Sequence, residues 1–367
     1  MKILLLNFIL HTPEKGIITR RETNKYTMIY TMARGFKKAG HDVTLLASEE
    51  YRPLNDENPG FKVIYFPSRL PEIFKPDLLP YPKGLKKWLK NNSADYDLAI
   101  TSEVFMMPSL IAYRSIKCNL VIWQELSAYQ KFMHKLPAKF WYNIIGRLFM
   151  RNAKIIPRSE NAYKFITKFF NKISTQIVDH GADSDIFFPG EKAENSFVVI
   201  SQLIKRKRID TIIEKFADLI KIPLYSSFLL HIIGEGEERQ NLENLAETLG
   251  IKNNVIFHGF LFHKEAAPIA RKTKAILINT ENDLNLVSVP ESIINGTPVL
   301  MNTVPNTSIF VNKQKVGIAK DEWGATELIE MIDRYDEFHQ NCIRVRDELT
   351  NVGAAKKLIE IAQSFDN

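Results

Sequence analysis

Two short apolar runs near the start of the chain, Ile3-Leu-Leu-Leu-Asn-Phe-Ile-Leu10 and Asp42-Val-Thr-Leu-Leu-Ala47, decide the fold. Such runs are typical of strands that a parallel sheet buries on both faces. Between them, apolar residues recur at helical spacing from Ile29 to Phe36. The helix is expected to end at Gly40, because glycine favours the left-handed conformation that closes a helix. The stretch therefore predicts one strand-helix-strand unit.

The same alternation continues along the chain. Further strands are predicted at 62–66, 97–101, 119–123, 153–157, 176–179, 197–201, 228–233, 255–257, 275–279 and 298–301. Strands that alternate with helices indicate an α/β protein with doubly wound parallel sheets. The pattern restarts after Phe187-Phe-Pro-Gly190. We therefore expect two Rossmann-like domains, 1–190 and 191–350, and a C-terminal helix at 351–367 that packs on the first domain.

Composition sets outer limits on function. The 367 residues are 45% apolar and 25% charged, which excludes a disordered or collagen-like chain. Residues 1–190 carry a net charge of +11, whereas residues 191–367 carry −4. Cys118 and Cys342 match no disulfide or zinc pattern, which favours a reducing compartment. No apolar run reaches the ~18–20 residues that span a bilayer, so we expect a cytoplasmic protein.

Two acidic residues eight positions apart stand out in the second half. Asp283 and Glu291 bracket a loop that leads into a helix starting near Pro290, and Gly296-Thr-Pro-Val299 follows. Backbone N–H groups at a helix start bind diphosphates, and carboxylates accept hydrogen bonds from sugar hydroxyls. An acidic residue that only stabilises the helix dipole explains the spacing equally well.

This stretch resembles the signature of the retaining glycosyltransferases of family 4, which have the GT-B fold of two Rossmann-like domains facing across a cleft. The signature is Glu, seven residues, Glu and then Gly-Thr-Pro-Val, with Asp283 here in place of the first glutamate. The resemblance implies that Asp283 contacts the transferred sugar, as a catalytic residue, and that Glu291 contacts the nucleotide ribose. Asn285, Leu286 and Val287 replace the glycine-rich stretch that approaches the donor.

A second match follows the first strand of the second domain, in Ser201-Gln-Leu-Ile-Lys-Arg-Lys-Arg208. The resemblance implies that Lys207 neutralises the donor pyrophosphate. Gln202 stands where the family has arginine and Arg208 where it has glycine, so Arg206 or Arg208 is expected to supply the missing cation. A solvated charge run is the alternative interpretation.

Other parts of the resemblance are positional. Gly234 and Phe260 lie in segments that resemble those holding the nucleotide base. In the first domain, the loop with Gly16 replaces the family's Gly-Gly loop, and Gln124 or Glu125 stands where the family has a histidine facing the sugar. We treat a catalytic part for Glu125 as a hypothesis.

Residues 131–158 contain seven lysines and arginines and no acidic residue, and an aromatic-rich apolar stripe runs through them. Such a helix is typical of an anionic lipid interface, although a core-packing helix with a basic edge fits equally well. The basic, tryptophan-containing stretch Lys83–Lys90 is a second such segment. The membrane interpretation predicts peripheral attachment to the inner face of the cytoplasmic membrane.

The resemblance thus implies a metal-independent, cofactor-free glycosyltransferase. Its expected donor is a UDP- or GDP-linked sugar, and its expected acceptor is a saccharide or a polyprenyl-diphosphate-linked saccharide in surface polysaccharide or glycolipid synthesis. A nucleotide-sugar epimerase of the same fold and a non-catalytic partner subunit are the alternatives. Nucleic-acid binding is suggested only by the sequence pI of about 9.1, without a motif to support it.

Overall fold

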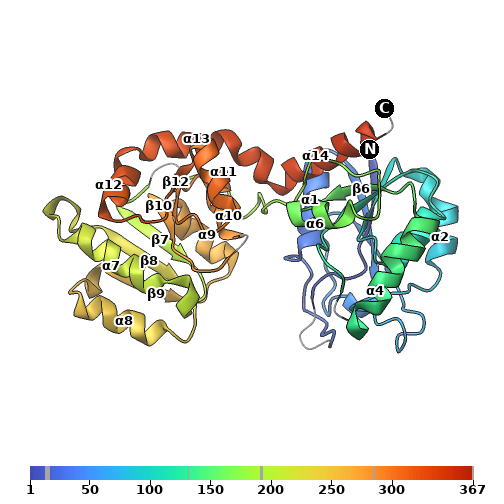
Figure 1. The fold of residues 1–367 in the computed structure, drawn as a ribbon, viewed down its shortest axis with the longest axis horizontal. Helices are drawn as coiled ribbons and strands as arrows, with labels where there is room; N and C mark the ends of the chain where they lie inside the picture. Colours follow the sequence, from blue (N-terminus) through green and yellow to red (C-terminus); the bar gives the residue numbers. More distant parts are fainter. Residues whose placement is uncertain (13–16, 131, 191–192, 284–285, 366–367) are drawn as a thin grey trace. The chain divides into compact units, whose positions relative to one another are not determined.

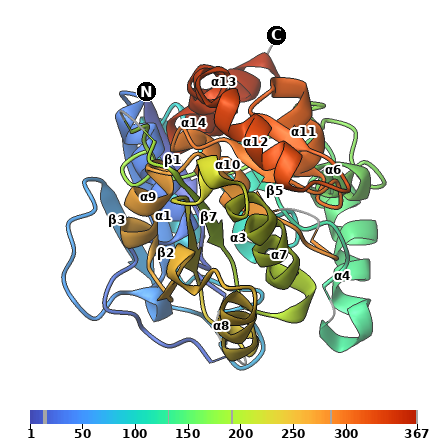
Figure 2. The ribbon, with the colours of Figure 1, turned by 90° about the vertical axis from the view of Figure 1, so that its left-hand side faces the viewer.

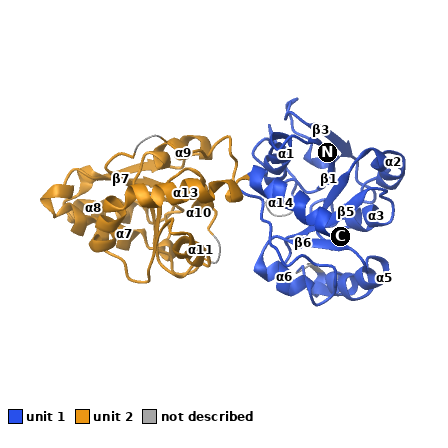
Figure 3. Cartoon of the chain, turned by 90° about the horizontal axis from the view of Figure 1, so that it is seen from above, with its two compact units in different colours: residues 1–181, 351–367 blue, residues 182–350 orange. Residues whose placement is uncertain are grey.

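The computed structural model describes residues 1–12, 17–130, 132–190, 193–283 and 286–365. The chain forms two compact units, shown in different colours in Figure 3. Unit 1 comprises residues 1–181 and 351–367, and unit 2 comprises residues 182–350.

Unit 1 is built on a six-stranded parallel sheet with strand order β3-β2-β1-β4-β5-β6. Its strands are β1 (Lys2–Leu6), β2 (Asp42–Ser48), β3 (Lys62–Phe66), β4 (Leu98–Ser102), β5 (Asn119–Gln124) and β6 (Lys154–Pro157). Its helices are α1 (Met28–Lys38), α2 (Leu85–Asn92), α3 (Met107–Tyr113), α4 (Leu136–Phe140), α5 (Arg147–Phe149), α6 (Glu160–Ile166) and α14 (Asn351–Ser364). Helices α1 and α14 share one core with the sheet (Figure 1), and α2 and α3 pack on the other face (Figure 3).

Unit 2 repeats this plan with strand order β12-β11-β10-β7-β8-β9, again all parallel. Its strands are β7 (Ser196–Ile200), β8 (Leu229–Ile233), β9 (Val255–Gly259), β10 (Ala275–Ile278), β11 (Val299–Met301) and β12 (Gly317–Ala319). Its helices are α7 (Ile209–Ile220), α8 (Arg239–Thr248), α9 (His263–Arg271), α10 (Ser288–Ile294), α11 (Thr307–Gln314), α12 (Ala325–Asp333) and α13 (Tyr335–Leu349). Figure 2 looks onto this unit, in which α7, α8 and α12 cover one face and α9, α10 and α11 the other.

The C-terminal helix α14 belongs to the core of unit 1. Its apolar side chains pack in the same cluster as β1, β2 and α1. At the crossing with α1, a Cβ atom on Gly35 would lie 2.3 Å from the carbonyl oxygen of Asn351. The Asn351 side chain donates a 2.8 Å hydrogen bond to the carbonyl oxygen of Thr31. Glycine at position 35 therefore permits the close contact between the two helices.

The division between the units differs from the boundary expected at residue 190, because unit 2 begins at Ala182. Ala182, Ile186 and Phe187 are buried in a small cluster with Ala267 and Ile294 of unit 2. The Pro-Gly pair at 189–190 thus lies inside unit 2, since the apolar residues before it already pack there.

Other differences concern short elements. The strand predicted at 176–179 does not form, because the backbone of Gln176 hydrogen-bonds in both directions with the Ser174 hydroxyl. The three-residue edge strand β12 has no counterpart among the predicted strands. The α/β class with two parallel sheets is confirmed.

Candidate functional site

A pocket lies where ligands of open parallel sheets usually bind. In unit 2 the strand order reverses between β7 and β10, and a pocket of about 170 Å³ opens at the carboxyl ends of these two strands. Gln202 and Lys207 line it from the β7 side, and Thr280 and Leu286 line it from the β10 side. The fold thus brings the two predicted donor-binding segments to one pocket.

Asp283 pairs with both predicted phosphate-binding cations. Its Oδ1 accepts a 2.6 Å hydrogen bond from Arg206 Nη1, and its Oδ2 accepts one of 2.7 Å from Lys207 Nζ. The Lys207 and Asp283 side chains are each only 14% exposed, whereas that of Arg206 is 42% exposed. Burial favours the neutral acid, but the donors from Lys207, Thr280 and Arg206 outweigh it and lower the pKa of Asp283. Two cations and one carboxylate leave this cluster with a net positive charge.

Thr280 completes the cluster, although no sequence pattern marks it. Its hydroxyl donates a 2.6 Å hydrogen bond to Asp283 Oδ2. Buried Asn302 holds the backbone of Thr280 through two hydrogen bonds, one to its carbonyl oxygen at 2.7 Å and one from its N–H at 3.3 Å. The Glu281 N–H donates to the Arg206 carbonyl oxygen at 2.8 Å, which joins the loops after β7 and β10. The geometry of the cluster is therefore fixed by the backbone.

Arg208 explains one departure from the family pattern. Its backbone adopts φ 47° and ψ 46°, the left-handed region where glycine is favoured. The arginine accepts this conformation directly before α7, and its Nε lies 4.0 Å from the Glu281 carboxylate. Arg208 therefore turns toward Glu281, and Arg206 is the second cation on Asp283.

Glu291 lies on α10 and differs electrostatically from Asp283. Its side chain is 13% exposed, and burial raises the pKa of Glu291 to about 8. Among the described residues, its one charged neighbour is His263, whose Nε2 lies 3.7 Å from Oε1. Burial also lowers the pKa of His263, which leaves that ring a poor counter-ion near neutral pH. Little in its surroundings therefore offsets the cost of burying the ionised form of Glu291.

The segments predicted to hold the base are also in unit 2. Gly234 adopts φ 143°, and a Cβ atom there would lie 1.8 Å from the Ser201 carbonyl oxygen, so the backbones at the ends of β7 and β8 approach closely. Phe260 follows β9 and is 65% exposed, with its ring edge-on to exposed Phe262. Close backbone approach explains the glycine, and the exposed ring is free of the core.

The other residues predicted to contact the ligands differ in exposure, and two of them lie outside the described residues. Leu286 is half-buried at the pocket, Val287 is exposed directly before α10, and Gln202 is exposed. Asn285 and Gly16 lie outside the described residues. No metal-binding group of three His, Cys, Asp or Glu side chains exists within the described ranges.

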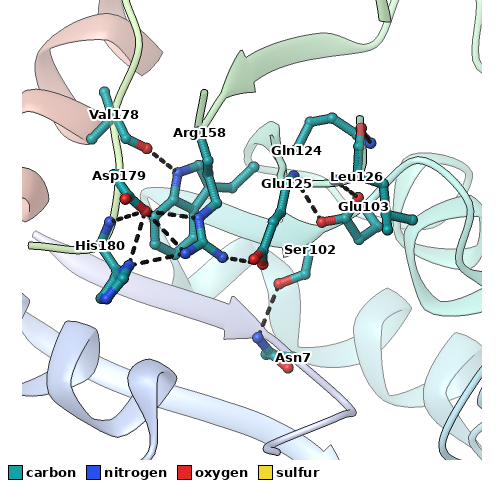
Figure 4. Close-up of polar contacts among 11 residues, drawn as sticks. Asn7, Ser102, Glu103, Gln124, Glu125, Leu126, Arg158, Val178, Asp179 and His180 are labelled. Atoms are coloured by element: carbon teal, nitrogen blue, oxygen red, sulfur yellow. Dashed lines mark hydrogen bonds and ion pairs between the residues drawn. The ribbon is translucent and has the colours of Figure 1, made fainter. Parts of the chain in front are cut away.

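In unit 1, charged residues follow three neighbouring strands, as Figure 4 shows. Glu103 follows β4, Glu125 follows β5 and Arg158 follows β6. Buried Glu103 accepts the backbone N–H groups of Glu125 and Leu126 at 2.8 and 3.0 Å. Burial nevertheless raises the pKa of Glu103 to about 7. Glu103 thereby fixes the loop that carries Glu125.

Gln124 and Glu125, the two residues predicted to face the sugar, are placed differently. Gln124 is fully buried, where its Oε1 accepts the Val104 N–H at 2.9 Å and its Nε2 donates to the Leu126 carbonyl at 2.9 Å. With these contacts the Gln124 side chain holds the backbone of the loops after β4 and β5, which is a structural role. The Glu125 side chain is 62% exposed and forms an ion pair with Arg158.

Arg158 is the centre of a network that sequence patterns did not reveal. Its guanidinium lies over the Trp123 ring, 4.6 Å from the ring centre, and donates to Asp179 Oδ1 at 3.0 Å. Its Nη2 also lies 3.0 Å from His180 Nδ1 (Figure 4). Burial opposes ionisation of Asp179, but His180 and Arg158 lower the pKa of Asp179 overall. The position of Arg158 directly after a predicted strand was the available signal.

Two family models match consecutive parts of the chain. The model described as "Glycosyltransferase Family 4" matches residues 27–185, and that described as "Glycosyl transferases group 1" matches residues 183–338. Together they cover residues 27–338, which is unit 1 from α1 to residue 181 and most of unit 2.

Curated relatives agree with these matches. An uncharacterized glycosyltransferase of Haemophilus influenzae is 24% identical over 326 residues, 82% of this chain and 83% of that protein. The alpha-monoglucosyldiacylglycerol synthase of Streptococcus pneumoniae is 22% identical over 316 residues, 79% of this chain and 70% of that protein.

Solved structures show the same fold. A glycosyltransferase from Rickettsia africae superposes with a TM-score of 0.62 at 12% identity and covers 100% of this chain, with 98% of its own chain matched. The Anabaena protein HepE in complex with UDP gives a TM-score of 0.59 at 13% identity, covering 99% of this chain and 100% of its own. With two parallel-sheet units, the acid-bracketed loop and the matching family models, this chain is a GT-B glycosyltransferase of family 4.

Proposed function

We propose that the protein transfers a sugar, with retention of configuration, from a nucleotide diphosphate donor to a saccharide or lipid-linked acceptor. The observation that carries the proposal is the pair of cations on Asp283 at the pocket between β7 and β10. A leaving nucleotide diphosphate develops negative charge, and fixed cations stabilise that charge as it forms. Structures of similar fold are described with UDP or with UDP and glucose bound, which supports a nucleotide-sugar donor.

In this proposal each residue of the cluster has a separate task. Lys207 and Arg206 bind the diphosphate, while Asp283 and Thr280 keep the two cations in place. Asp283 accepts hydrogen bonds from the transferred sugar, and Glu291 accepts them from the ribose hydroxyls. Phe260 stacks on the base. A catalytic part for exposed Glu125 of unit 1 stays a separate hypothesis. Transfer then relies on positioning and on stabilisation of the leaving group.

The acceptor class is supported by the names of the relatives. They include a synthase named for diacylglycerol and a lipopolysaccharide core glycosyltransferase from Rhizobium meliloti, 26% identical over 122 residues and 33% of this chain. We propose an acceptor of the same general class, in surface polysaccharide or glycolipid synthesis.

Nucleotide binding tests the donor site directly. At a ligand concentration about 100 times Kd, a nucleotide that binds only the folded state adds ~2.7 kcal/mol to the free energy of unfolding. We expect UDP or GDP, and the matching nucleotide sugar, to raise Tm by several degrees, whereas free ribose leaves it unchanged. If neither nucleotide shifts Tm, the proposed donor site is wrong. A shift without transfer to any lipid-linked or saccharide acceptor would instead support a non-catalytic partner subunit.

The helical segment from α4 to α5 has two apolar faces. Trp141 and Tyr142 are buried in the unit 1 core, and Trp141 Nε1 donates to the Val104 carbonyl oxygen at 2.8 Å. On the outer face an apolar residue is exposed at every fourth position. These residues and their exposed fractions are Leu136, 64%; Phe140, 55%; Ile144, 43%; and Leu148, 70%. The segment therefore packs on the core and also presents an apolar stripe to solvent.

We propose that this stripe binds an anionic membrane surface. Every charged residue between Glu125 and Glu160 is basic, so the stripe is flanked by cations such as Lys139 and Arg147. Basic, aromatic-rich amphipathic helices insert their apolar face at the lipid headgroup level. Among the described residues no helix combines the length and apolarity that a membrane-spanning helix requires.

Liposome co-sedimentation tests the membrane proposal. The double substitution Phe140→Ser and Leu148→Ser is expected to reduce binding to phosphatidylglycerol-containing vesicles by about tenfold or more, because two large apolar groups no longer insert. The matched control Leu224→Ser with Ile309→Ser removes two exposed apolar residues of unit 2, which are 77% and 71% exposed, and should bind like the wild type. Equal binding by both double variants, or no dependence on anionic lipid, would contradict the proposal.

A further inference from the structure

A second hollow in unit 1 lies away from the charged network of Figure 4. It has a volume of about 860 Å³ and lies between the loop that follows β3 and helix α2. Tyr81, Ile111 and Ser68 contribute to its wall. Five cations line it, and the described residues of its wall include no carboxylate: Arg69, Lys83, Lys86, Lys87 and Lys90. We name this hollow the basic groove.

The loop side of the basic groove is held by backbone hydrogen bonds. The Arg69 N–H donates to the Tyr81 carbonyl oxygen at 2.7 Å, and the Lys83 N–H donates to the Pro67 carbonyl oxygen at 2.8 Å. Ser68 and Pro82 form an antiparallel bridge between these two bonds. Outside the wall, the Glu50 carboxylate accepts the Ser68 N–H at 3.3 Å. The two loop cations, Arg69 and Lys83, are therefore carried by a braced pair of extended segments.

The helix side of the basic groove is held by the core. Leu85 and Leu89 of α2 are fully buried with residues of β1 and β4, which fixes the rotation of the helix. Lys86, Lys87 and Lys90 consequently lie on the exposed side. In Figure 3, α2 lies at the edge of unit 1 beside α3.

No ion pair within the described residues neutralises the cations of the basic groove. Among the described residues, no carboxylate forms an ion pair with any of the five, and the Arg69 guanidinium lies over the Tyr81 ring, 5.5 Å from its centre. Lys86 and Lys90 are like charges at i and i+4, a spacing that destabilises a helix by about 0.2–0.5 kcal/mol. Five cations around one hollow, without ion-pair partners among the described residues, favour the binding of an anionic ligand with several charges.

We propose that the basic groove binds a phosphate-bearing polyanion with at least two adjacent negative charges, of the diphosphate class. Resting on the proposed function, this ligand is the anionic part of the acceptor: either its diphosphate or the headgroup of an anionic lipid that presents it. The groove is separate from the donor cations of unit 2, so the chain carries two anion sites.

Calorimetric titration of the full-length protein with inorganic pyrophosphate tests the two-site prediction. The wild type is expected to bind two equivalents. The triple substitution of Lys86, Lys87 and Lys90 by alanine should lose one, with an affinity drop of about tenfold or more at that site. Alanine is a good helix former, so α2 is retained. The control triple substitution of exposed Lys117, Lys313 and Lys356 by alanine should still bind two equivalents.

The donor-site variant Arg206→Ala with Lys207→Ala separates this inference from the proposed function. It should keep the equivalent that the Lys86, Lys87 and Lys90 triple variant loses. Loss of all binding in the donor-site variant, or unchanged binding in the triple variant, overturns the basic groove. If pyrophosphate still binds the groove but no nucleotide shifts Tm, the groove stands and the donor proposal fails.

Vesicles distinguish the two sources of the anion. Phosphatidylcholine vesicles containing phosphatidylglycerol should displace pyrophosphate from the groove if the ligand is a lipid headgroup. They should leave it bound if the ligand is the diphosphate of the acceptor. Pure phosphatidylcholine vesicles should displace nothing in either case, and displacement by them would contradict the electrostatic basis of the proposal.

Discussion

Substituting Lys207 by alanine is expected to lower the rate of sugar transfer by about 10²–10³-fold, the usual cost of removing one preorganised group that stabilises transition-state charge. Lys207 is the less exposed of the two cations on Asp283, and it lines the pocket proposed to bind the donor. Arg206 is more exposed, so its removal should cost less. The measurement is nucleotide release in the presence of acceptor, with the donor that the nucleotide screen identifies.

The folded state should survive this substitution. Asp283 keeps Arg206 and Thr280 as hydrogen-bond donors when Lys207 is gone. We therefore expect the free energy of unfolding to fall by only about 1 kcal/mol, the value of one hydrogen bond. Neighbouring Lys205, exposed and without an ion pair among the described residues, is the control: Lys205→Ala should keep full activity.

A double variant separates folding from catalysis at this site. Adding Asp283→Asn to Lys207→Ala removes the carboxylate that lost one of its three hydrogen-bond donors. It should recover stability but not transfer, because Asp283 is itself proposed to contact the sugar. Restored transfer in the double variant would mean that Lys207 only balances Asp283. In that case the lysine would have no part in binding the diphosphate.

The sequence was sufficient for the two sheets because parallel strands are buried on both faces. Runs such as Ile3–Leu10 are therefore short and almost wholly apolar, and glycines mark helix ends between them. Gly317–Ala319 was missed because three residues at a sheet edge give no periodicity. The boundary was placed at 190 because of Pro189 and Gly190. These residues mark a turn, but they do not show that Phe187 before them is buried in unit 2.

The candidate site was only partly predictable. The spacing of the acidic residues singled out Asp283, and the family resemblance singled out Lys207. These residues are 76 positions apart, and the hydrogen bond between them depends on β7 lying beside β10. Thr280 and Arg158 are single polar residues with no motif around them. The role of Glu103 could not be predicted for a further reason. It depends on burial of the side chain and on two backbone N–H donors from a loop more distant in the sequence.

Glu291 gives the second large prediction, which concerns pH. With a pKa of about 8, this carboxyl group is mostly protonated at neutral pH, whereas the proposed contact with the ribose hydroxyls is strongest for the carboxylate. Nucleotide affinity should therefore rise from pH 6.5 to pH 8.5 by on the order of tenfold, since below its pKa the ionised fraction changes about tenfold per pH unit. Calorimetric Kd values across this range provide the measurement.

The substitution Glu291→Gln isolates this group from other titrations. A terminal nucleotide phosphate titrates near pH ~6 and contributes its own slope, which both proteins share. At pH 8.5 the glutamine variant should bind more weakly by about tenfold, because a neutral acceptor replaces a charged one. At pH 6.5 the two proteins should bind alike, so the variant should lack the rise in affinity toward pH 8.5. An identical pH profile in both proteins would exclude Glu291 as the source.

Folding stability should show the opposite trend with pH, because the same pKa shift acts on the protein without ligand. A pKa raised in the folded state gives stability that is complete below the unfolded value of 4.5 and is lost as pH rises through 8. Between these limits the wild type should lose on the order of 2–5 kcal/mol relative to Glu291→Gln, from ~1.4 kcal/mol per pKa unit. Glu103 titrates in both proteins, so it cancels in the difference. Denaturation at pH 5 and pH 8.5 should therefore find the glutamine variant relatively more stable at the higher pH. Ionised Glu291 therefore lowers folding stability at the pH where nucleotide binding is expected to be strongest. Equal stability differences between the two proteins at pH 5 and pH 8.5 would contradict the raised pKa of Glu291.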